Sequence, residues 1–329
     1  MSVSASGQSL SAGLRVPVAP VPVLLIIASL ALFVVTAAAT RSFDQLSWAG
    51  LVGLLERMVA LGIVALGQTF VILAGSIDLS VANLISVAAV MASFVMQGRT
   101  AMIGPAVALV LAIAVLVGAG NGALVARLRV NPFIATLGVG LCLQGVLSAS
   151  FNDFAGSVPS SFQVVAYGHV GPLPLPIAGL LLLTAAAAFV LGWTRFGAHV
   201  YARGGNEEGA RQAGIRTGRV LIAAHVVSSL AGGVTGLYLA ARLRSGAPWV
   251  GRDGVYDLQS IAVVVIGGTL LSGGRGGAVG SFAGALLFAS LDAAFTMLGL
   301  DAFLQQVLRG VIVIAAVGAY SWRQMRHVA

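Results

Sequence analysis

The chain has 329 residues, of which 58% are hydrophobic and only 9% are charged. Ordinary soluble domains carry about 25% charged residues, so this composition cannot build a water-soluble surface and excludes a soluble globular protein. All 18 basic residues are arginine, which removes any chemistry that needs a lysine, including a phosphate-loop ATPase motif. The net charge of +8 indicates no nucleic-acid partner, because basic residues collect in the cytoplasmic loops of membrane proteins.

Long apolar runs recur along the chain. A helix needs about 20 apolar residues to cross the roughly 30 Å hydrocarbon layer of a lipid bilayer. Because lipid offers no hydrogen bonds to the backbone, a spanning structure is either helical or a closed barrel. The run at 221–241 lacks the polar alternation of a barrel strand. We therefore expect an all-α fold, a polytopic bundle of transmembrane helices.

The predicted organisation is an N-terminal tail (1–20), a transmembrane domain (21–320) and a C-terminal tail (321–329). The first apolar run is longer than the apolar region of a signal peptide, so we interpret it as the first span. Asn131 and Pro132 mark the start of the fifth span, since proline fits the first turn of a helix. About ten spans are expected. They lie at 21–40, 53–74, 81–97, 103–125, 132–150, 173–193, 219–241, 259–272, 277–297 and 303–320.

This topology distributes the arginines unevenly between the two sides of the membrane. With the amino terminus inside and ten spans, both termini are cytoplasmic. The larger arginine set then also lies inside, as expected for cytoplasmic loops. The inner set is Arg15, Arg127, Arg129, Arg195, Arg203, Arg211, Arg216, Arg219, Arg275, Arg323 and Arg326, and the outer set is Arg41, Arg99, Arg242, Arg244 and Arg252.

The most polar stretch of the chain follows the sixth span. Residues 205–215 carry Glu, Ala, Arg and Gln, which favour helix, between glycines. Asn206 is placed as an N-cap and Gly214 as the residue that ends the helix. Acidic residues in the first turn and Arg211 near the last turn suit the helix dipole. We expect a short polar helix on the cytoplasmic face, and the residues alone leave open whether it is only a solvated connector.

Four segments, in consistent order from about residue 50 onward, carry a resemblance to a known family. They are GQTFVILAGSIDLSVANL at 67–84, NGALVARLRVNPFIATLG at 121–138, GGNEEGARQAGI at 204–215 and YDLQSIAVVVIGGTLLSGGRGGAVGSFAGALL at 256–287. They resemble the permease subunits of bacterial ABC importers of the ribose, xylose and arabinose branch. The resemblance implies a multi-pass inner-membrane subunit that moves a sugar or similar small polyhydroxylated solute by alternating access.

The resemblance also implies partners. In that family two permease subunits form the pore, two cytoplasmic ABC ATPase subunits hydrolyse ATP, and a periplasmic or extracellular solute-binding protein delivers the solute. The second permease is either another copy or a related chain. ATP and Mg would then bind to the partner ATPase, and this chain would bind no cofactor and would not be an enzyme. Docking of the ATPase is implied for Gly204, Gly205, Asn206, Glu207, Glu208, Ala210, Arg211 and Gly214.

Polar residues within the apolar spans are candidates for contact with the solute, because such groups are costly in lipid and normally face a cavity or a partner. Each also has a structural interpretation: a bond between packed helices, a helix cap formed by Asp78 or Ser80, or a bond to its own helix for Thr136. Asp292 is the sharpest candidate, at a position where the family commonly has asparagine. The set is Gln68, Thr69, Asp78, Asn83, Thr136, Gln144, Ser148, Asp292 and Thr296.

The alternative function is a secondary carrier of a small polar solute, driven by an ion gradient. It would need ion-binding or proton-relay groups at the membrane midplane, and only Asp292, with Arg309, offers them. The histidines show no metal-ligand spacing and no catalytic triad appears, so neither a metal site nor an intramembrane enzyme is expected.

Two glycine-containing segments suggest an internal duplication. ILAGSIDLS at 72–80 aligns with VVIGGTLLS at 264–272, and each closes one apolar run before another begins. Transporters are often built from repeated halves. We interpret the glycines that follow, at 273–277, as a tight inner turn around Arg275 rather than a phosphate cradle, since the lysine of that motif is missing.

Overall fold

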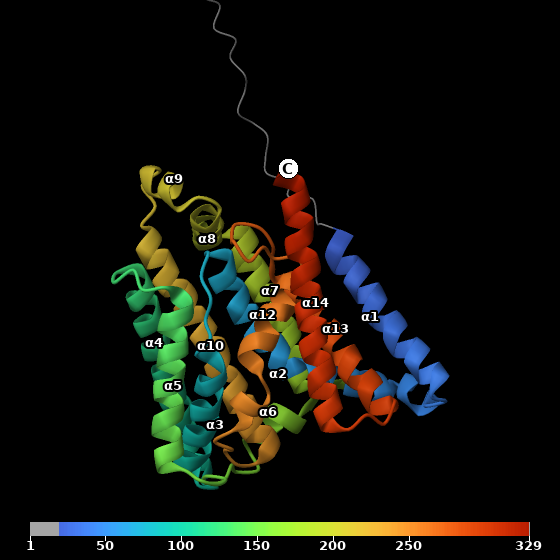
Figure 1. Cartoon of the computed structure of the whole chain (residues 1–329). Helices are drawn as coiled ribbons and strands as arrows, with labels where there is room; N and C mark the ends of the chain where they lie inside the picture. Colours follow the sequence, from blue (N-terminus) through green and yellow to red (C-terminus); the bar gives the residue numbers. More distant parts are fainter. Residues whose placement is uncertain (1–19, 329) are drawn as a thin grey trace, which may run out of the picture.

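A computed structural model describes residues 20–328, and this part of the chain is almost entirely helical (Figure 1). Seven of its helices are long and apolar enough to cross a membrane, and two shorter apolar helices accompany them. The prediction of an all-α, polytopic bundle is confirmed. The helices are α1 (Pro20–Ala39), η1 (Phe43–Leu46), α2 (Trp48–Leu73), α3 (Val81–Met96), η2 (Thr100–Met102), α4 (Ile103–Ala126), α5 (Pro132–Ser150), α6 (Val164–Tyr167), α7 (Leu175–Trp193), α8 (Arg195–Gly205), α9 (Glu207–Gln212), α10 (Thr217–Leu243), α11 (Val250–Asp253), α12 (Tyr256–Ile266), α13 (Ala278–Met297) and α14 (Ala302–Val328).

Each expected span corresponds to one of these helices, and their starts show why. Asn131 accepts a hydrogen bond from the backbone of Phe133 at 2.9 Å, with Pro132 in the first turn, so α5 begins where its sequence predicts. A two-stranded antiparallel pair, β1 (His169–Val170) and β2 (Leu173–Pro174), precedes α7. The last helix continues to Val328, beyond the end expected for the tenth span.

The core is formed by the short helix α3, most of whose residues are buried, and by the long helices α2, α10 and α13. Between 56% and 72% of the most apolar stretch of each of these long helices is buried, whereas the corresponding share of α1, α4 and α5 is 22%. Small residues permit the close packing. At Gly118 and Gly122 of α4, an added Cβ atom would collide with the backbone of α10, because glycine allows membrane helices to approach at short distance. The outer helices therefore leave much of their apolar surface for lipid or for other subunits.

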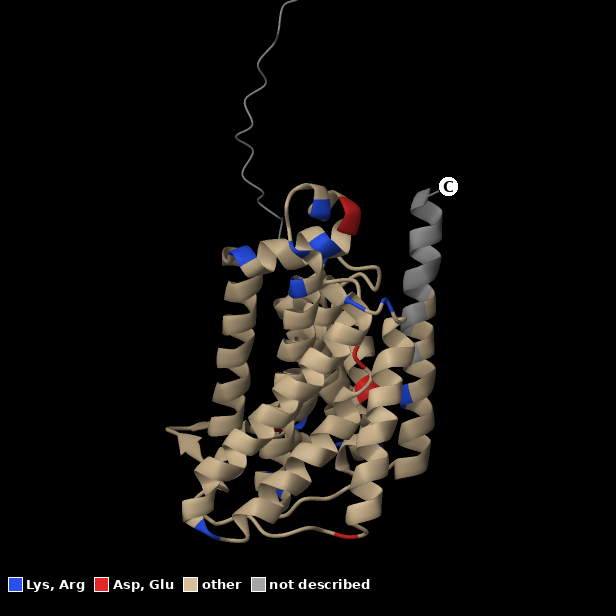
Figure 2. Ribbon diagram, turned by 90° about the vertical axis from the view of Figure 1, so that its left-hand side faces the viewer, with Lys and Arg blue, Asp and Glu red and all other residues tan. Residues whose placement is uncertain are grey.

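The start of α1 and the end of α14 lie at the same end of the bundle as α8 and α9 (Figure 1). Basic residues gather at this end (Figure 2), and we take it as the cytoplasmic end for that reason. Most of the expected N-terminal tail, with Arg15, lies outside the described residues. The arrangement agrees with the predicted topology, in which both termini and the polar segment share one side.

The expected eighth span, 259–272, is wrong in extent. Helix α12 ends at Ile266 and has 11 residues, which at 1.5 Å per residue cover about half of the hydrocarbon layer. Residues 267–277 form no helix, and backbone φ angles of +93° at Gly268 and +91° at Gly273 explain the break, since only glycine adopts them without strain.

Another break occurs earlier in the chain, at residues 74–80, where it separates α2 from α3. We call residues 74–80 the first junction and residues 267–277 the second junction. Non-helical backbone at membrane depth is tolerated only where protein or a water-filled cavity surrounds it. Both junctions lie at the cytoplasmic end, next to α8, and they position the candidate site.

Candidate functional site: the polar helices α8 and α9 and the two junctions

The predicted short polar helix is present as α9. The Asn206 side chain accepts a hydrogen bond from the backbone of Gly209 at 2.9 Å and so caps the helix. Gly214 follows the helix end with a φ of +83°, the left-handed conformation common after a helix. Glu208 and Arg211 form an exposed ion pair at 2.7 Å, which contributes little to stability because water screens it. The charged side chains of α9 are therefore available to a partner.

The glycines Gly204 and Gly205 belong to the end of a separate helix, α8, rather than to the helix that contains Glu207. The two glycines have different surroundings. A Cβ atom at Gly204 would collide with the carbonyl oxygen of Leu73 and the backbone nitrogen of Gly274, whereas nothing lies near a Cβ at Gly205. Gly204 is thus the point at which α8 packs against both junctions, one on each side.

Arg203 fastens α8 to the first junction. Its side chain is only 9% exposed, donates a hydrogen bond to the carbonyl of Ala74 and pairs with Glu207 at 3.3 Å. The pKa of the Arg203 guanidinium lies below its usual value, because burial lowers it by more than the Glu207 carboxylate raises it. Arginine remains protonated in proteins, so a buried charge links α8, α9 and the first junction. The sequence analysis placed Arg203 only as a cytoplasmic arginine and missed this role.

Tyr201 fastens α8 to the second junction. Its hydroxyl donates a hydrogen bond to the carbonyl of Gly276 at 2.9 Å, and burial raises the pKa of this hydroxyl. The second junction is also bonded to the end of α2, directly before the first junction, since the backbone nitrogen of Gly274 donates to the carbonyl of Leu73 at 3.0 Å. A displacement of α8 is therefore transmitted to both helix breaks.

Within the first junction, Asp78 and Ser80 are fully buried. One Asp78 carboxylate oxygen accepts hydrogen bonds from the backbone nitrogen of Ser80 at 3.0 Å and from its hydroxyl at 2.7 Å. Asn121 of α4 donates to the Ser80 hydroxyl at 2.8 Å. The predicted helix cap is wrong in detail, because Ser80 is the N-cap residue of α3 and makes no side-chain cap bond. Asp78 instead stabilises the turn that leads into the helix.

Two further helices bond to the first junction. Thr136 of α5 accepts a hydrogen bond from the backbone of Leu79 at 3.0 Å and donates to its own helix at Pro132. Ser76 is hydrogen-bonded to His225 of α10 at 3.0 Å. The first junction thus contacts α4, α5, α8 and α10. Sequence reasoning missed Asn121 and His225, and the only available signal was a polar residue within an apolar run.

Three buried polar atoms of this cluster have no hydrogen-bond partner among the residues whose side chains the structure describes: one oxygen of Asp78, the amide oxygen of Asn121 and one ring nitrogen of His225. Buried polar groups are rarely left unpaired. These three atoms therefore mark the place at which the fold keeps hydrogen-bonding groups that other described residues do not use. No group of three His, Cys, Asp or Glu residues that would suit a metal ion occurs in the described part.

The remaining solute-contact candidates are spread over the bundle. Thr69 of α2 is hydrogen-bonded to Ser281 of α13 at 2.6 Å, which supports its structural interpretation. Gln68 is fully buried, and its amide atoms have no partner among the described residues. On α3 and α5, Asn83 and Gln144 are half-buried and Ser148 is exposed. The structure does not bring the candidates together in one site.

Asp292 lies apart, between α13 and α14. Its carboxylate pairs with the Arg309 guanidinium at 2.8 Å, and each side chain is about 30% exposed. Thr296 is exposed and donates a hydrogen bond to the backbone carbonyl of Asp292. Charges in a membrane helix normally find such a partner. The secondary-carrier alternative depends on Asp292. The charge of this carboxylate is compensated by Arg309, the only other residue that the alternative offered.

Comparison with known proteins identifies the class to which this arrangement belongs. Residues 50–317 match the family described as branched-chain amino acid transport system / permease component. The chain belongs to this family of transporter permease components, and it is a multi-pass protein of the bacterial inner membrane.

Among its relatives are import permeases whose names include ribose or galactose. The ribose import permease protein RbsC of Escherichia coli (strain K12) is 35% identical over 300 residues, which cover 89% of this chain and 91% of that protein. Its counterpart in Bacillus subtilis (strain 168) is 34% identical, covering 81% and 83%. The galactose/methyl galactoside import permease protein MglC of E. coli (strain K12) is 32% identical, covering 80% and 84%. No solved structure matches the chain.

Proposed function

We propose that this chain is the permease subunit of an ABC importer for a sugar or a similar small polyhydroxylated solute. The printed names of its relatives, which refer to ribose and to galactose, support this class of solute. The observation that carries the proposal is the contact of α8 with both helix breaks, through Arg203, Gly204 and Tyr201. A transport subunit driven from outside needs a mechanical connection of this kind between its cytoplasmic face and its spans.

The mechanism begins with the exposed helix α9. A partner ATPase subunit binds it through Glu207, Glu208 and Arg211, so that ATP and Mg are bound by the partner and this chain performs no hydrolysis. Closure of the ATPase subunits on ATP moves α9 together with α8. Because α8 is packed against both junctions, α3 and α13, which start there, are displaced relative to their neighbours. The pathway then opens alternately to the two sides.

The solute enters from a binding protein at the opposite end and passes between two permease subunits. Helices α4 and α5, with 22% of their apolar stretches buried, leave surface for such a pathway. Asn83, Gln144 and Ser148 provide hydrogen-bonding groups along α3 and α5. Hydroxylated solutes need such groups, since a site without them would leave solute hydroxyls unpaired.

The secondary carrier is the weaker function. It requires an ionisable group at the midplane that is free to bind an ion, and Asp292 is paired with Arg309 instead. Proteoliposomes that contain the purified chain without an ATPase separate the two functions. Solute uptake driven by an ion gradient in those vesicles would establish the carrier and exclude the importer.

The test of the proposed function is charge reversal on α9 in the importer reconstituted with its ATPase and binding protein. The triple variant Glu207→Lys, Glu208→Lys and Arg211→Glu is expected to abolish ATP-driven uptake. Glu208 and Arg211 are 63% and 56% exposed, but Glu207 pairs with the buried Arg203, so the double variant Glu208→Lys and Arg211→Glu, which keeps that pair, is measured beside it and should lose uptake as well. The control is Arg195→Glu, a reversal at an exposed residue of α8 outside the docking segment, which should retain uptake. Full uptake by the triple variant contradicts the proposal.

A further inference from the structure

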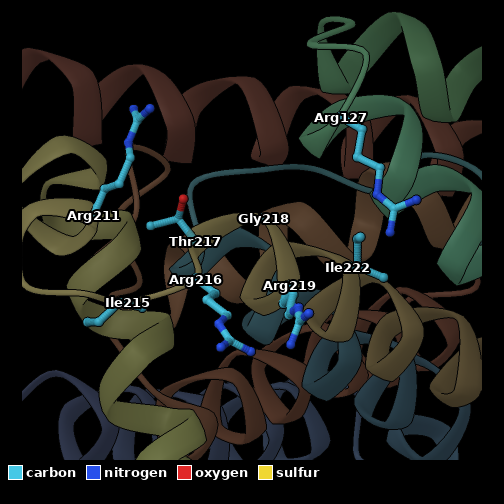
Figure 3. Close-up of a pocket in the computed structure, with 8 residues that line it drawn as sticks. All are labelled: Arg127, Arg211, Ile215, Arg216, Thr217, Gly218, Arg219 and Ile222. Atoms are coloured by element: carbon cyan, nitrogen blue, oxygen red, sulfur yellow. The ribbon is translucent and has the colours of Figure 1, made fainter.

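Four arginines line one hollow at the cytoplasmic end (Figure 3). The hollow has a volume of about 430 Å³ and lies between the end of α4, helix α9 and the first turns of α10. Arg127 comes from the end of α4, Arg211 from α9, and Arg216 and Arg219 from the start of α10. These arginines come from three separate elements, so local sequence clustering does not explain their convergence.

The positive charge of this hollow is largely uncompensated. Arg211 pairs with Glu208. Arg127, Arg216 and Arg219 form no ion pair with any residue whose side chain the structure describes. The residues that line the hollow include no acidic side chain. Three free guanidiniums beside one cavity favour an anion, and arginine binds phosphate groups through paired N–H donors.

An apolar groove continues from the same hollow toward the membrane. It has a volume of about 550 Å³ and shares Arg127, Arg219 and Ile222 with the arginine hollow. Its other lining residues are apolar: Phe196, Ala223, Val226 and Val227. Ile222, Ala223, Val226 and Val227 follow Arg219 along one face of α10. From Arg219 to Val227 this face extends about 12 Å at 1.5 Å per residue. The groove is therefore charged at its mouth and apolar along its length.

Glycine packing sets the shape of this groove. Gly122 of α4 lies against Ile222, and Gly118 lies against Val226, so close that neither position leaves room for a side chain. This contact fixes the end of α4 beside the start of α10. As a result, Arg127 and Arg219 lie at the same mouth of the groove. The site is thus built by the fold of the described helices and does not depend on a flexible loop.

We propose that this groove binds an anionic phospholipid. Arg127, Arg216 and Arg219 bind the phosphate of the headgroup, and an acyl chain lies along Ile222, Ala223, Val226 and Val227. An acidic surface of a partner protein would match the arginines but would not use the apolar stripe at membrane depth. A phospholipid matches both parts. Because α9 also lines the hollow, lipid bound there contacts the segment that connects the spans to the cytoplasm.

The experiment measures lipid retention by the purified full-length permease. Detergent-solubilised protein is mixed with equal amounts of phosphatidylglycerol and phosphatidylcholine, and the bound lipids are counted by native mass spectrometry. Phosphatidylglycerol should be retained preferentially. The double variant Arg127→Gln and Arg219→Gln should lower its affinity by roughly 30-fold, because each arginine near an anionic lipid contributes about a fivefold factor. The control variant, Arg129→Gln and Arg195→Gln, removes the same charge from the same face and should retain the lipid.

Several outcomes would overturn the proposal. Equal retention of the two lipids by the unmodified chain excludes an anionic lipid site, whether or not the variants fold. Equal losses in the test and control variants indicate a general charge effect. If inorganic phosphate alone displaces the bound phosphatidylglycerol, the hollow is a phosphate site rather than a lipid site. If the test variant keeps its lipid but loses the ATPase or the second permease in pull-down assays, the hollow is a protein interface.

Discussion

The two helix breaks at the cytoplasmic end are stabilised in different ways. The first junction is held by polar side chains, with Asp78, Ser76 and Ser80 all buried and bonded. The second junction is held mainly by backbone bonds, and only the hydroxyls of Thr269 and Tyr201 add side-chain bonds to it among the described residues. Gly268, Gly273, Gly274 and Gly276 all have positive φ angles, and Leu270 donates a backbone hydrogen bond to the carbonyl of Arg275 at 2.9 Å.

This difference shows two solutions to one problem. A helix that stops within a membrane protein exposes carbonyl and N–H groups that need partners. At the first junction Thr136 of α5 and Arg203 of α8 bond to the backbone, and α4 and α10 bond to the side chains of Ser80 and Ser76, so the break depends on the packing of distant helices. At the second junction glycines allow the chain to turn back and bond to itself. The first junction should therefore be sensitive to side-chain deletion, and the second to an added Cβ atom.

The largest effect is expected where both junctions meet α8. Gly204→Ala places a methyl group against the Leu73 carbonyl and the Gly274 backbone, so α8 must move away from both breaks. We expect ATP-driven uptake to fall by about tenfold or more, since a loss of about 1.4 kcal/mol already shifts an equilibrium tenfold. Uptake in proteoliposomes is the measurement. Gly205→Ala, with open space around the new methyl group, is the matched control and should transport normally.

The next comparison is between the two bonds by which α8 holds the junctions. Arg203→Gln removes a charged, buried donor to Ala74 and should lower the free energy of unfolding by about 1.5 to 3 kcal/mol. Tyr201→Phe removes a neutral bond to the exposed Gly276, and about 0.5 to 1.5 kcal/mol is expected. Thermal unfolding in detergent measures both. A larger loss for Tyr201→Phe would mean that α8 is held more strongly by its bond to the second junction than by its bond to the first.

Glycine substitution tests the backbone of each junction. Gly75 in the first junction and Gly273 in the second both have positive φ, at +74° and +91°. An added Cβ at Gly75 has its nearest neighbour at 3.6 Å, whereas at Gly273 it lies 2.9 Å from the backbone of Gly75. Gly75→Ala should cost about 1 kcal/mol from the backbone conformation alone. Gly273→Ala should lower the melting temperature further, and equal shifts would argue against a tighter second junction.

The smallest effect is expected at Ser272, which aligns with Ser80 of the first junction. Ser80→Ala breaks the bonds to Asp78 and Asn121 and should cost about 1 to 3 kcal/mol, because buried polar partners are left unpaired. Ser272→Ala, at the aligned position of the second junction, alters an exposed side chain and should change stability by less than about 0.5 kcal/mol. Comparable losses in thermal unfolding would mean that side chains hold both junctions alike.

The aligned segments 72–80 and 264–272 do fall at corresponding places, since α2 ends at Leu73 and α12 ends at Ile266. Whether the halves arose by duplication stays a prediction. What the alignment could not show is that the two breaks touch, with Gly273 packed against Gly75 and Gly274 bonded to Leu73 at the end of α2. Such a contact joins residues far apart in the chain, and no local pattern reports it.

Local patterns determined much of this protein from sequence. Apolar runs of sufficient length predict the helices, and arginine placement predicts which end is cytoplasmic. Capping residues predict α9 and the start of α5, because a cap bond joins residues only two or three positions apart. The eighth span was predicted too long, since its glycines and leucines are apolar enough to continue a helix.

The tertiary structure alone decided which polar residues have partners. Asp292 and Asp78 look alike in sequence, as single acids in or beside apolar runs. In the fold, Asp292 pairs with an arginine and Asp78 belongs to a buried cluster formed with other helices. Lipid makes every unpaired polar group costly, so the chain must satisfy such groups from within. Which distant residue provides the partner depends on how the helices pack, and that packing places α8 against both junctions.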